Sequence, residues 1–129
     1  MTDIDRTFIV PTVLIADDDP DLVSLIALRL TKAGYTVLTA SDGEEALKMA
    51  EEFLPDLAVL DVMMPKLTGL DVTRRLREKP ETQHILVMLI SAGFEHNEIW
   101  GLPAGADDYV KKPFGPQEIP NRVQAVLAR

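Results

Sequence analysis

The sequence of 129 residues contains no cysteine and few aromatic residues, which make up 5% of the chain. The absence of cysteine excludes disulfide bonds and thiolate metal sites. Basic residues are also scarce, because 13 lysines and arginines face 21 aspartates and glutamates, which gives a net charge of -8. A chain with this charge repels polyanions. We therefore expect no direct binding to nucleic acid and none to an anionic membrane surface.

Long apolar segments are missing as well. The longest uninterrupted apolar run, residues 85–90, is far shorter than the roughly 18 residues that a membrane span needs. Residues 1–6 include two aspartates and no apolar core of signal-peptide length. The overall composition, 47% apolar and 26% charged, is typical of a globular domain. These features predict a soluble, cytoplasmic protein with one domain spanning 1–129, in which residues 1–11 form an N-terminal extension.

Short apolar runs alternate with amphipathic segments along the chain. The runs predict strands at 12–16, 36–40, 57–60, 85–90 and 109–111. Several are continuous Val/Ile/Leu runs, as expected of parallel strands covered on both faces. Apolar spacing predicts helices at 22–33, at 44–54, at 69–78, weakly at about 95–102, and at 119–127. This βα alternation predicts an α/β fold, a flavodoxin-like (βα)5 three-layer sandwich with parallel strand order 2-1-3-4-5.

Polar residues follow the predicted strands where each strand ends. Asp17, Asp18 and Asp19 follow the first strand and Asp61 follows the third, while Ser91 and Lys112 follow the fourth and fifth. In such a sheet the carboxyl ends meet at one edge, where ligands bind. Crowded carboxylates repel one another, and a hard divalent cation such as Mg²⁺ or Mn²⁺ relieves the repulsion. The same cation and a lysine would neutralise an incoming phosphoryl group, with one carboxylate as nucleophile.

Each of these residues also has an ordinary structural interpretation. An aspartate after a strand is commonly a turn or capping residue. Asp19 followed by Pro20 predicts a helix start, with Asp19 as N-cap and Pro20 at the first helical position. A single serine or lysine in a loop is commonly solvated. The argument for a phosphoryl-transfer site therefore depends on all four strand ends together, and Asp61 is the candidate nucleophile because it stands alone on the central strand.

The chain resembles the receiver domain (CheY-like) of bacterial two-component response regulators over nearly its whole length. The motifs that carry the resemblance are LIADDD at 14–19, DVMMP at 61–65 with Gly69, SA at 91–92 and GADDYVKKPF at 105–114. The resemblance implies that Asp61 accepts a phosphoryl group from a sensor histidine kinase or a phosphotransfer protein. It implies that Mg²⁺ is held by Asp17, Asp18, Asp61 and the backbone carbonyl of Met63. No separate turnover substrate is expected, so the domain is not a classical enzyme.

The resemblance also assigns roles around the phosphoacceptor. Lys112, which precedes Pro113, matches the family lysine, and in the family this bond is usually cis. Ser91 matches the switch hydroxyl and Tyr109 the switch aromatic. On phosphorylation Ser91 would donate to the phosphoryl group and Tyr109 would turn inward. The face made by the fourth helix, fifth strand and fifth helix would report the change to an output domain or a protein target.

The sequence around residues 105–122 resembles the OmpR/PhoB-type subclass, in which an Asp–Arg network helps to form an activated dimer. Asp108, Glu118 and Arg122 match that network, whereas Trp100 and Pro103 depart from it. A monomer and a phosphorylation-dependent dimer therefore both stay open. Two other functions remain as alternatives. One is a degenerate receiver that acts only as an interaction module, and the other is a small aspartyl-phosphate hydrolase.

Overall fold

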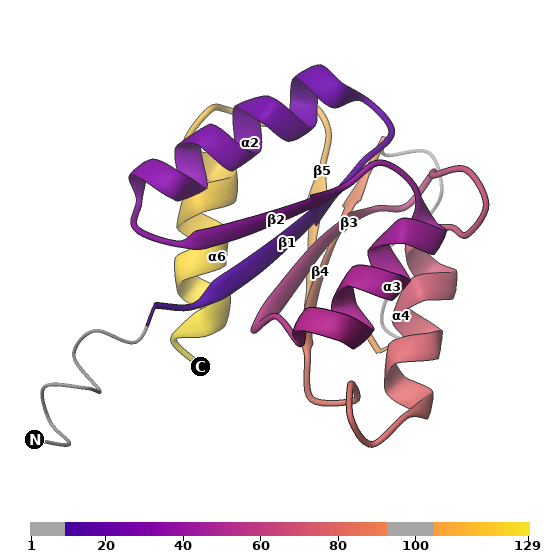
Figure 1. Cartoon of the computed structure of the whole chain (residues 1–129). Helices are drawn as coiled ribbons and strands as arrows, with labels where there is room; N and C mark the ends of the chain where they lie inside the picture. The colour runs from indigo at the N-terminus through magenta and orange to yellow at the C-terminus, as the bar shows by residue number, and fades with distance from the viewer. Residues whose placement is uncertain (1–9, 93–104) are drawn as a thin grey trace, which may run out of the picture.

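The computed structural model describes residues 10–92 and 105–129, which form a parallel sheet with helices on both faces (Figure 1). The strands are β1 (Thr12–Ala16), β2 (Thr36–Ala40), β3 (Leu57–Asp61), β4 (Leu86–Ser91) and β5 (Asp108–Lys111). The helices are α2 (Pro20–Lys32), α3 (Gly43–Phe53), α4 (Gly69–Glu78) and α6 (Glu118–Leu127). The strand order is β2-β1-β3-β4-β5, so the predicted α/β topology is confirmed. The helix predicted at about 95–102 lies outside the described residues.

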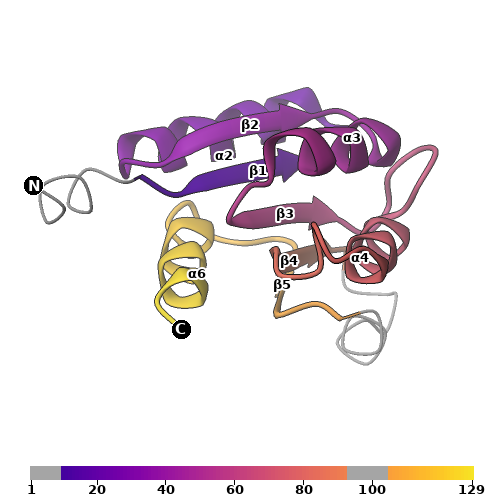
Figure 2. The ribbon, with the colours of Figure 1, turned by 60° about the horizontal axis from the view of Figure 1, so that its bottom comes forward.

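Alternating strand residues build two separate cores, one on each face of the sheet. On one face, Val13 and Ile15 of β1 pack with Ile26 of α2 and Val123 of α6. On the other face, Leu14 packs in the second core, to which α3 and α4 also contribute. Figure 2 shows the two layers of helices with the sheet between them. All five residues of β3 are buried, which explains why the central strand reads as a continuous apolar run ending in one aspartate.

The helix boundaries follow from capping residues. Asp19 is the N-cap of α2 and accepts hydrogen bonds from the backbone N–H groups of Asp21 and Leu22, with Pro20 at the start, as predicted. At the start of α4, Thr68 and Asp71 form a reciprocal capping box. The strand boundaries differ from the prediction by one residue, since β3 includes Asp61, β4 runs from Leu86 to Ser91 and β5 begins at Asp108. No helix within the described parts of the chain is long and apolar enough to cross a membrane.

Candidate functional site

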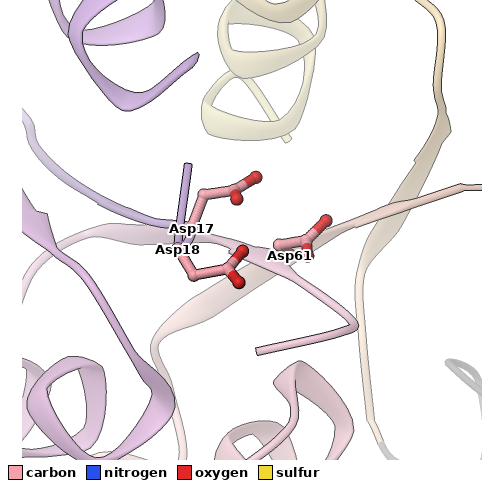
Figure 3. A group of neighbouring side chains, drawn as sticks. All are labelled: Asp17, Asp18 and Asp61. Atoms are coloured by element: carbon pink, nitrogen blue, oxygen red, sulfur yellow. The ribbon is translucent and has the colours of Figure 1, made fainter. Parts of the chain in front are cut away.

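The carboxyl ends of β1 and β3 bring three aspartates together, as the strand order requires. Asp17, Asp18 and Asp61 each offer a carboxylate oxygen, and these oxygens lie within 4.8 Å of one another. Figure 3 shows the three side chains, two that follow β1 and one at the end of β3, gathered in one place. Asp17 and Asp61 are buried, while Asp18 is exposed. We call these three residues the acidic cluster, and their meeting at the sheet edge was predicted from the sequence.

The loop after β1 is held by backbone hydrogen bonds that fix the first carboxylate of the cluster. The backbone N–H of Asp19 donates to Oδ1 of Asp17 at 3.0 Å. Asp19 itself caps α2 through its side chain. The third aspartate of the DDD motif therefore caps a helix and lies outside the acidic cluster, as its ordinary interpretation predicted.

Close backbone packing positions the second strand end. A Cβ at Gly69 would lie 2.5 Å from the carbonyl oxygen of Asp61, which leaves space for glycine only. The backbone N–H of Gly69 also donates to the carbonyl of Val62 at 2.9 Å. The first turn of α4 therefore packs directly against the backbone of Asp61.

The loop between β3 and α4, residues 62–68, likewise packs closely against a glycine, at the start of α3. A Cβ at Gly43 would lie 1.8 Å from the carbonyl oxygen of Leu67, and the Gly43 N–H donates to the carbonyl of Pro65 at 3.2 Å. Lys66 reaches Asp42, the N-cap of α3, with 3.5 Å between Nζ and Oδ2. Sequence reasoning missed this contact, and the only signal for it was a glycine at the first position of a helix.

Lys112 lies against the acidic cluster. Its Nζ is 3.0 Å from Oδ1 of Asp61 and 3.4 Å from Oδ2 of Asp17. The Lys112 backbone N–H donates to the carbonyl of Ser91 at 2.7 Å, which continues the β4–β5 ladder by one residue. The peptide bond between Lys112 and Pro113 is cis. The structure therefore brings Lys112, rather than the adjacent Lys111, to the two buried aspartates.

The electrostatics of the cluster favour proton or cation uptake. Burial, and next to it the charge of Asp17, raise the pKa of Asp61 from an ordinary value of 3.8 to about 6 against the opposing effect of Lys112. Burial likewise raises the pKa of Asp17, although the backbone N–H of Asp19 and the charge of Lys112 oppose the rise. Burial lowers the pKa of Lys112, but its hydrogen bond to Asp61 and the two carboxylate charges outweigh this and raise it. Both carboxylates are therefore costly to ionise without a further positive charge.

The donor set fits a hard divalent cation. Three carboxylates face one ammonium group, which leaves an excess of negative charge. All three offer oxygen ligands, which Mg²⁺ and Mn²⁺ prefer to imidazole or thiolate. An open groove of about 430 Å³, lined by Asp17, Asp18 and Ser41 among others, leads to the cluster from the side of α2 and α3.

The remaining predicted residues lie on the neighbouring strands. Ser91 is fully buried at the end of β4, and its register partner on β5 is Lys111. Tyr109 pairs with Leu89 in the β4–β5 register and packs, half-buried, against the core that α3 and α4 share. The side chain of Met63 is exposed, two residues after Asp61. Their roles in switching and in metal binding stay predictions.

The charged residues of the predicted dimer network pair within the chain. Nη1 of Arg122 lies 3.0 Å from Oδ1 of Asp108, and Nη2 lies 3.8 Å from Oε2 of Glu118. This brings together the three described residues that match the OmpR/PhoB-type network. Trp100 and Pro103, which depart from it, lie outside the described residues.

Comparisons with known proteins agree with this geometry. A sequence model of the response regulator receiver domain matches residues 13–124. The alkaline phosphatase synthesis transcriptional regulatory protein PhoP of Bacillus subtilis is 48% identical over 117 residues, which cover 91% of this chain and 48% of that protein. The DNA-binding dual master transcriptional regulator RpaA of Synechocystis is 42% identical over 120 residues, covering 92% of this chain and 50% of that protein. The chain thus spans about half the length of these curated relatives.

Solved structures give the same result. A putative response regulator from Chloroflexus aurantiacus superposes with a TM-score of 0.87 at 39% identity, covering 94% of this chain and 100% of that one. The response regulator TrrA from Thermotoga maritima, in complex with Mg²⁺ and BeF, gives a TM-score of 0.80 at 32% identity and covers 91% of this chain and 99% of that one. The receiver domain of a sensor histidine kinase from Pseudomonas aeruginosa, with magnesium in its active site cleft, gives 0.84 at 26% identity and covers 94% and 100%.

Proposed function

The chain belongs to the response regulator receiver domain family of two-component signalling, and on this basis we propose that Asp61 is its phosphoacceptor. The observation that carries the proposal is the position of Asp61, which is buried between the other acids and the Lys112 ammonium at 3.0 Å. The side chain of Asp19 caps α2, which argues against this role for Asp19.

The reaction is a phosphoryl transfer to a carboxylate. An Oδ of ionised Asp61 attacks the phosphorus of a phosphohistidine on a sensor histidine kinase or a phosphotransfer protein. A P–O bond forms, the P–N bond breaks, and the imidazole leaves with its electron pair. Lys112 neutralises charge on the phosphoryl oxygens as they approach, because its ammonium already lies beside Asp61. No separate substrate is turned over, so the domain acts as an acceptor and not as a classical enzyme.

Mg²⁺, or Mn²⁺ in its place, would be held by Asp17, Asp18, Asp61 and the backbone carbonyl of Met63. The cation supplies charge neutralisation for the transferred group when bound. Among the chain's own residues, Lys112 favours the ionised, nucleophilic form of Asp61 by lowering its pKa against the effects of burial and of Asp17. With a pKa of about 6, the carboxyl is mostly ionised at neutral pH. Asp18 is the exposed member of the acidic cluster and lines the groove beside α2, so the site is accessible from that groove.

After transfer, the added charge acts on two neighbouring strands. Ser91, at the end of β4, moves to donate to the phosphoryl group, and Tyr109 on β5 turns into the space that is vacated. The change then reaches the face that includes β5 and α6, where Arg122 pairs with Asp108. This is a shift between two states, limited by their differential affinity for the phosphoryl group.

The relatives named above are transcriptional regulators of about twice this length. We propose that the chain serves as the receiver of such a regulator, in the cytoplasm, with DNA contacts made by another domain because this one carries a charge of -8. Asp108 and Arg122 would contribute to the interface of a phosphorylation-dependent dimer. The alternative is that the domain stays monomeric.

The test is mass spectrometry of the protein after incubation with Mg²⁺ and a small phosphodonor, followed by borohydride trapping of the acyl phosphate. Asp61→Asn should abolish labelling, whereas Asp19→Asn should label like the wild type because asparagine retains the cap. Labelling at another residue in Asp61→Asn would refute the assignment. No uptake by the wild type would favour a degenerate receiver, and steady release of phosphate with turnover would favour a hydrolase.

A further inference from the structure

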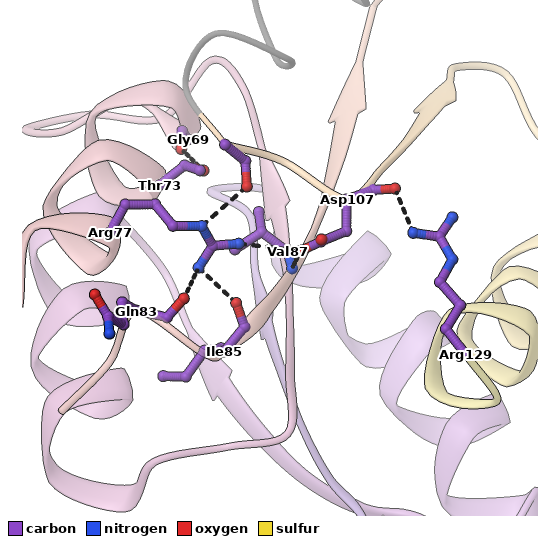
Figure 4. A network of polar contacts seen from close by, with 9 residues as sticks. Gly69, Thr73, Arg77, Gln83, Ile85, Val87, Asp107 and Arg129 are labelled. Carbon is purple, nitrogen blue, oxygen red and sulfur yellow. Dashed lines mark hydrogen bonds and ion pairs between the residues drawn. The ribbon is translucent and has the colours of Figure 1, made fainter. Parts of the chain in front are cut away.

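A polar network lies at the opposite end of the sheet from the acidic cluster, where β4 and β5 begin (Figure 4). Its centre is Arg77, in the last turn of α4. The guanidinium donates from Nε to the carbonyl of Gly105 at 3.0 Å, and from Nη1 to the carbonyls of Gln83 at 3.1 Å and Ile85 at 2.7 Å. Nη2 pairs with Oδ2 of Asp107 at 3.0 Å. One rigid guanidinium fork thus joins α4 to the segments that enter both strands.

Asp107 is the second centre of the network. Its Oδ2 also accepts from the backbone N–H of Val87 at 2.9 Å, while its own N–H donates to the Val87 carbonyl at 2.8 Å. Its carbonyl accepts from Nη1 of Arg129 at 3.1 Å. Asp107 therefore ties the residue before β5 to β4, to α4 and to the chain after α6.

This attachment matters because it fixes the start of β5, whereas Arg122, which pairs with Asp108 and donates to the carbonyl of Tyr109, approaches the strand from α6. Strand β5 is four residues long, it stands at the end of the strand order, and β4 is the strand that it pairs with among the described residues. Lys112 follows its last residue directly, and the side chain of Lys112 must reach Asp61 at 3.0 Å. A small displacement of β5 along β4 would therefore be transmitted to the Lys112 ammonium.

We propose that Arg77 is a positioning residue for the phosphorylation site, acting through Asp107 and β5 to hold Lys112 against Asp61. The side chains of Arg77 and Asp107 are 24% and 29% exposed, so their ion pair is partly protected from solvent. The functional consequence rests on the proposed role of Asp61, whereas the positional claim does not. Arg77 contacts neither Asp61 nor Lys112 in any of its hydrogen bonds given above, which separates it from the catalytic residues.

The functional test is a double-mutant cycle on the rate of labelling by a small phosphodonor. Lys112→Ala should lower the rate about 100-fold, as expected for the loss of a charge-stabilising donor. Arg77→Met should lower it about tenfold, since misplacement of a catalytic group by a fraction of an ångström has effects of this order. In the Lys112→Ala background, Arg77→Met should have no further effect. The same tenfold loss in both backgrounds would show that Arg77 does not act through Lys112, and would overturn the proposal.

Two further variants separate positioning from general stability. Arg77→Lys keeps the charge and should recover part of the rate, and Asp107→Asn keeps the acceptor for Val87 and should lose about threefold. The matched control is Thr82→Val, which removes a buried hydrogen bond to the carbonyl of Leu76 and lacks contact with β5 in the bonds described. It should lower the melting temperature and leave the labelling rate unchanged. A rate loss in Thr82→Val equal to that in Arg77→Met would attribute the effect to stability alone.

Amide hydrogen exchange tests the positional claim without any phosphorylation. In Arg77→Met the Lys112 amide, which donates to Ser91, should exchange at least about tenfold faster than in Thr82→Val, while β1 amides exchange alike in both. Unchanged protection at Lys112 would overturn the positioning role even if Asp61 is phosphorylated. Conversely, faster exchange together with full labelling of Asp61→Asn would support the positioning of Lys112 and refute the proposed phosphoacceptor.

Discussion

Replacing Asp61 by asparagine should stabilise the domain at neutral and alkaline pH when divalent cations are absent. Asparagine has nearly the shape of protonated aspartate but cannot ionise. In the folded domain burial and the charge of Asp17 raise the pKa of Asp61 from 3.8 to about 6. Ionisation therefore costs more in the folded state than in the unfolded chain. The wild type carries this cost, and Asp61→Asn does not.

The size of the stability difference between wild type and Asp61→Asn, and the pH range over which it develops, follow from the shift in the pKa of Asp61. A pKa that rises from 3.8 to about 6 on folding corresponds to at most about 3 kcal/mol of lost stability once the group is ionised in both states. Below the unfolded value of 3.8 the group is protonated in both states and the loss is absent. The contribution of Asp61 to the stability of the wild type should therefore fall as pH rises from 3.8 through about 6 and change no further above it. The advantage of Asp61→Asn should grow over the same range.

Urea unfolding followed by circular dichroism, in the presence of a chelator, measures this difference from about pH 3.5 to 8. Glu52→Gln, an exposed neutralisation on α3, is the matched control and should follow the wild type at every pH. Addition of Mg²⁺ at a hundred times the dissociation constant should then stabilise the wild type by about 2.7 kcal/mol and should stabilise Asp61→Asn by less. A variant that is no more stable at pH 8, or whose advantage grows as the pH falls, would refute the electrostatic reasoning.

Two further changes test the metal site and its backbone support. Asp18→Asn removes the exposed carboxylate of the acidic cluster and should weaken Mg²⁺ binding about tenfold in calorimetric titration, and an unchanged affinity would remove Asp18 from the ligand set. Gly69→Ala places a Cβ 2.5 Å from the Asp61 carbonyl oxygen and should cost about 2 kcal/mol in urea unfolding, whereas Gly115→Ala, which has open space around it, should change stability by less than about 0.5 kcal/mol. Equal stabilities of the two glycine variants would show that α4 does not seat against Asp61 as closely as described.

Much of the fold was predictable because the strongest sequence signals, buried apolar runs and capping residues, directly determine strands and helix ends. The apolar run that ends in Asp61 is the strand buried at all five positions, and a run of this kind has few other interpretations. Asp19 followed by Pro20 gave the start of α2 correctly, since capping depends on local chemistry alone. The strand ends were uncertain by one residue because hydrogen bonding to a neighbouring strand, and not composition, decides where a strand stops.

The meeting of Asp17, Asp18, Asp61 and Lys112 was predictable from strand order, since parallel topology fixes which chain positions share an edge. The contacts of Arg77 were not predictable in this way. Its partners are mainly backbone carbonyls, and carbonyls carry no residue-specific signal in a sequence. An arginine in the last turn of a helix is ordinarily explained by the helix dipole.

The seating of residues 62–68 on Gly43 also constrains how the domain can be altered. The loop that follows Asp61 and the first residue of α3 occupy one space, because the carbonyl of Leu67 lies where a side chain on Gly43 would be. A loop transplanted from a related domain will therefore fit only if the first residue of α3 in the recipient leaves room for the backbone of that loop. Because residues 62–68 and the start of α3 must fit each other, chimeras that exchange this loop should exchange Asp42 and Gly43 together with it.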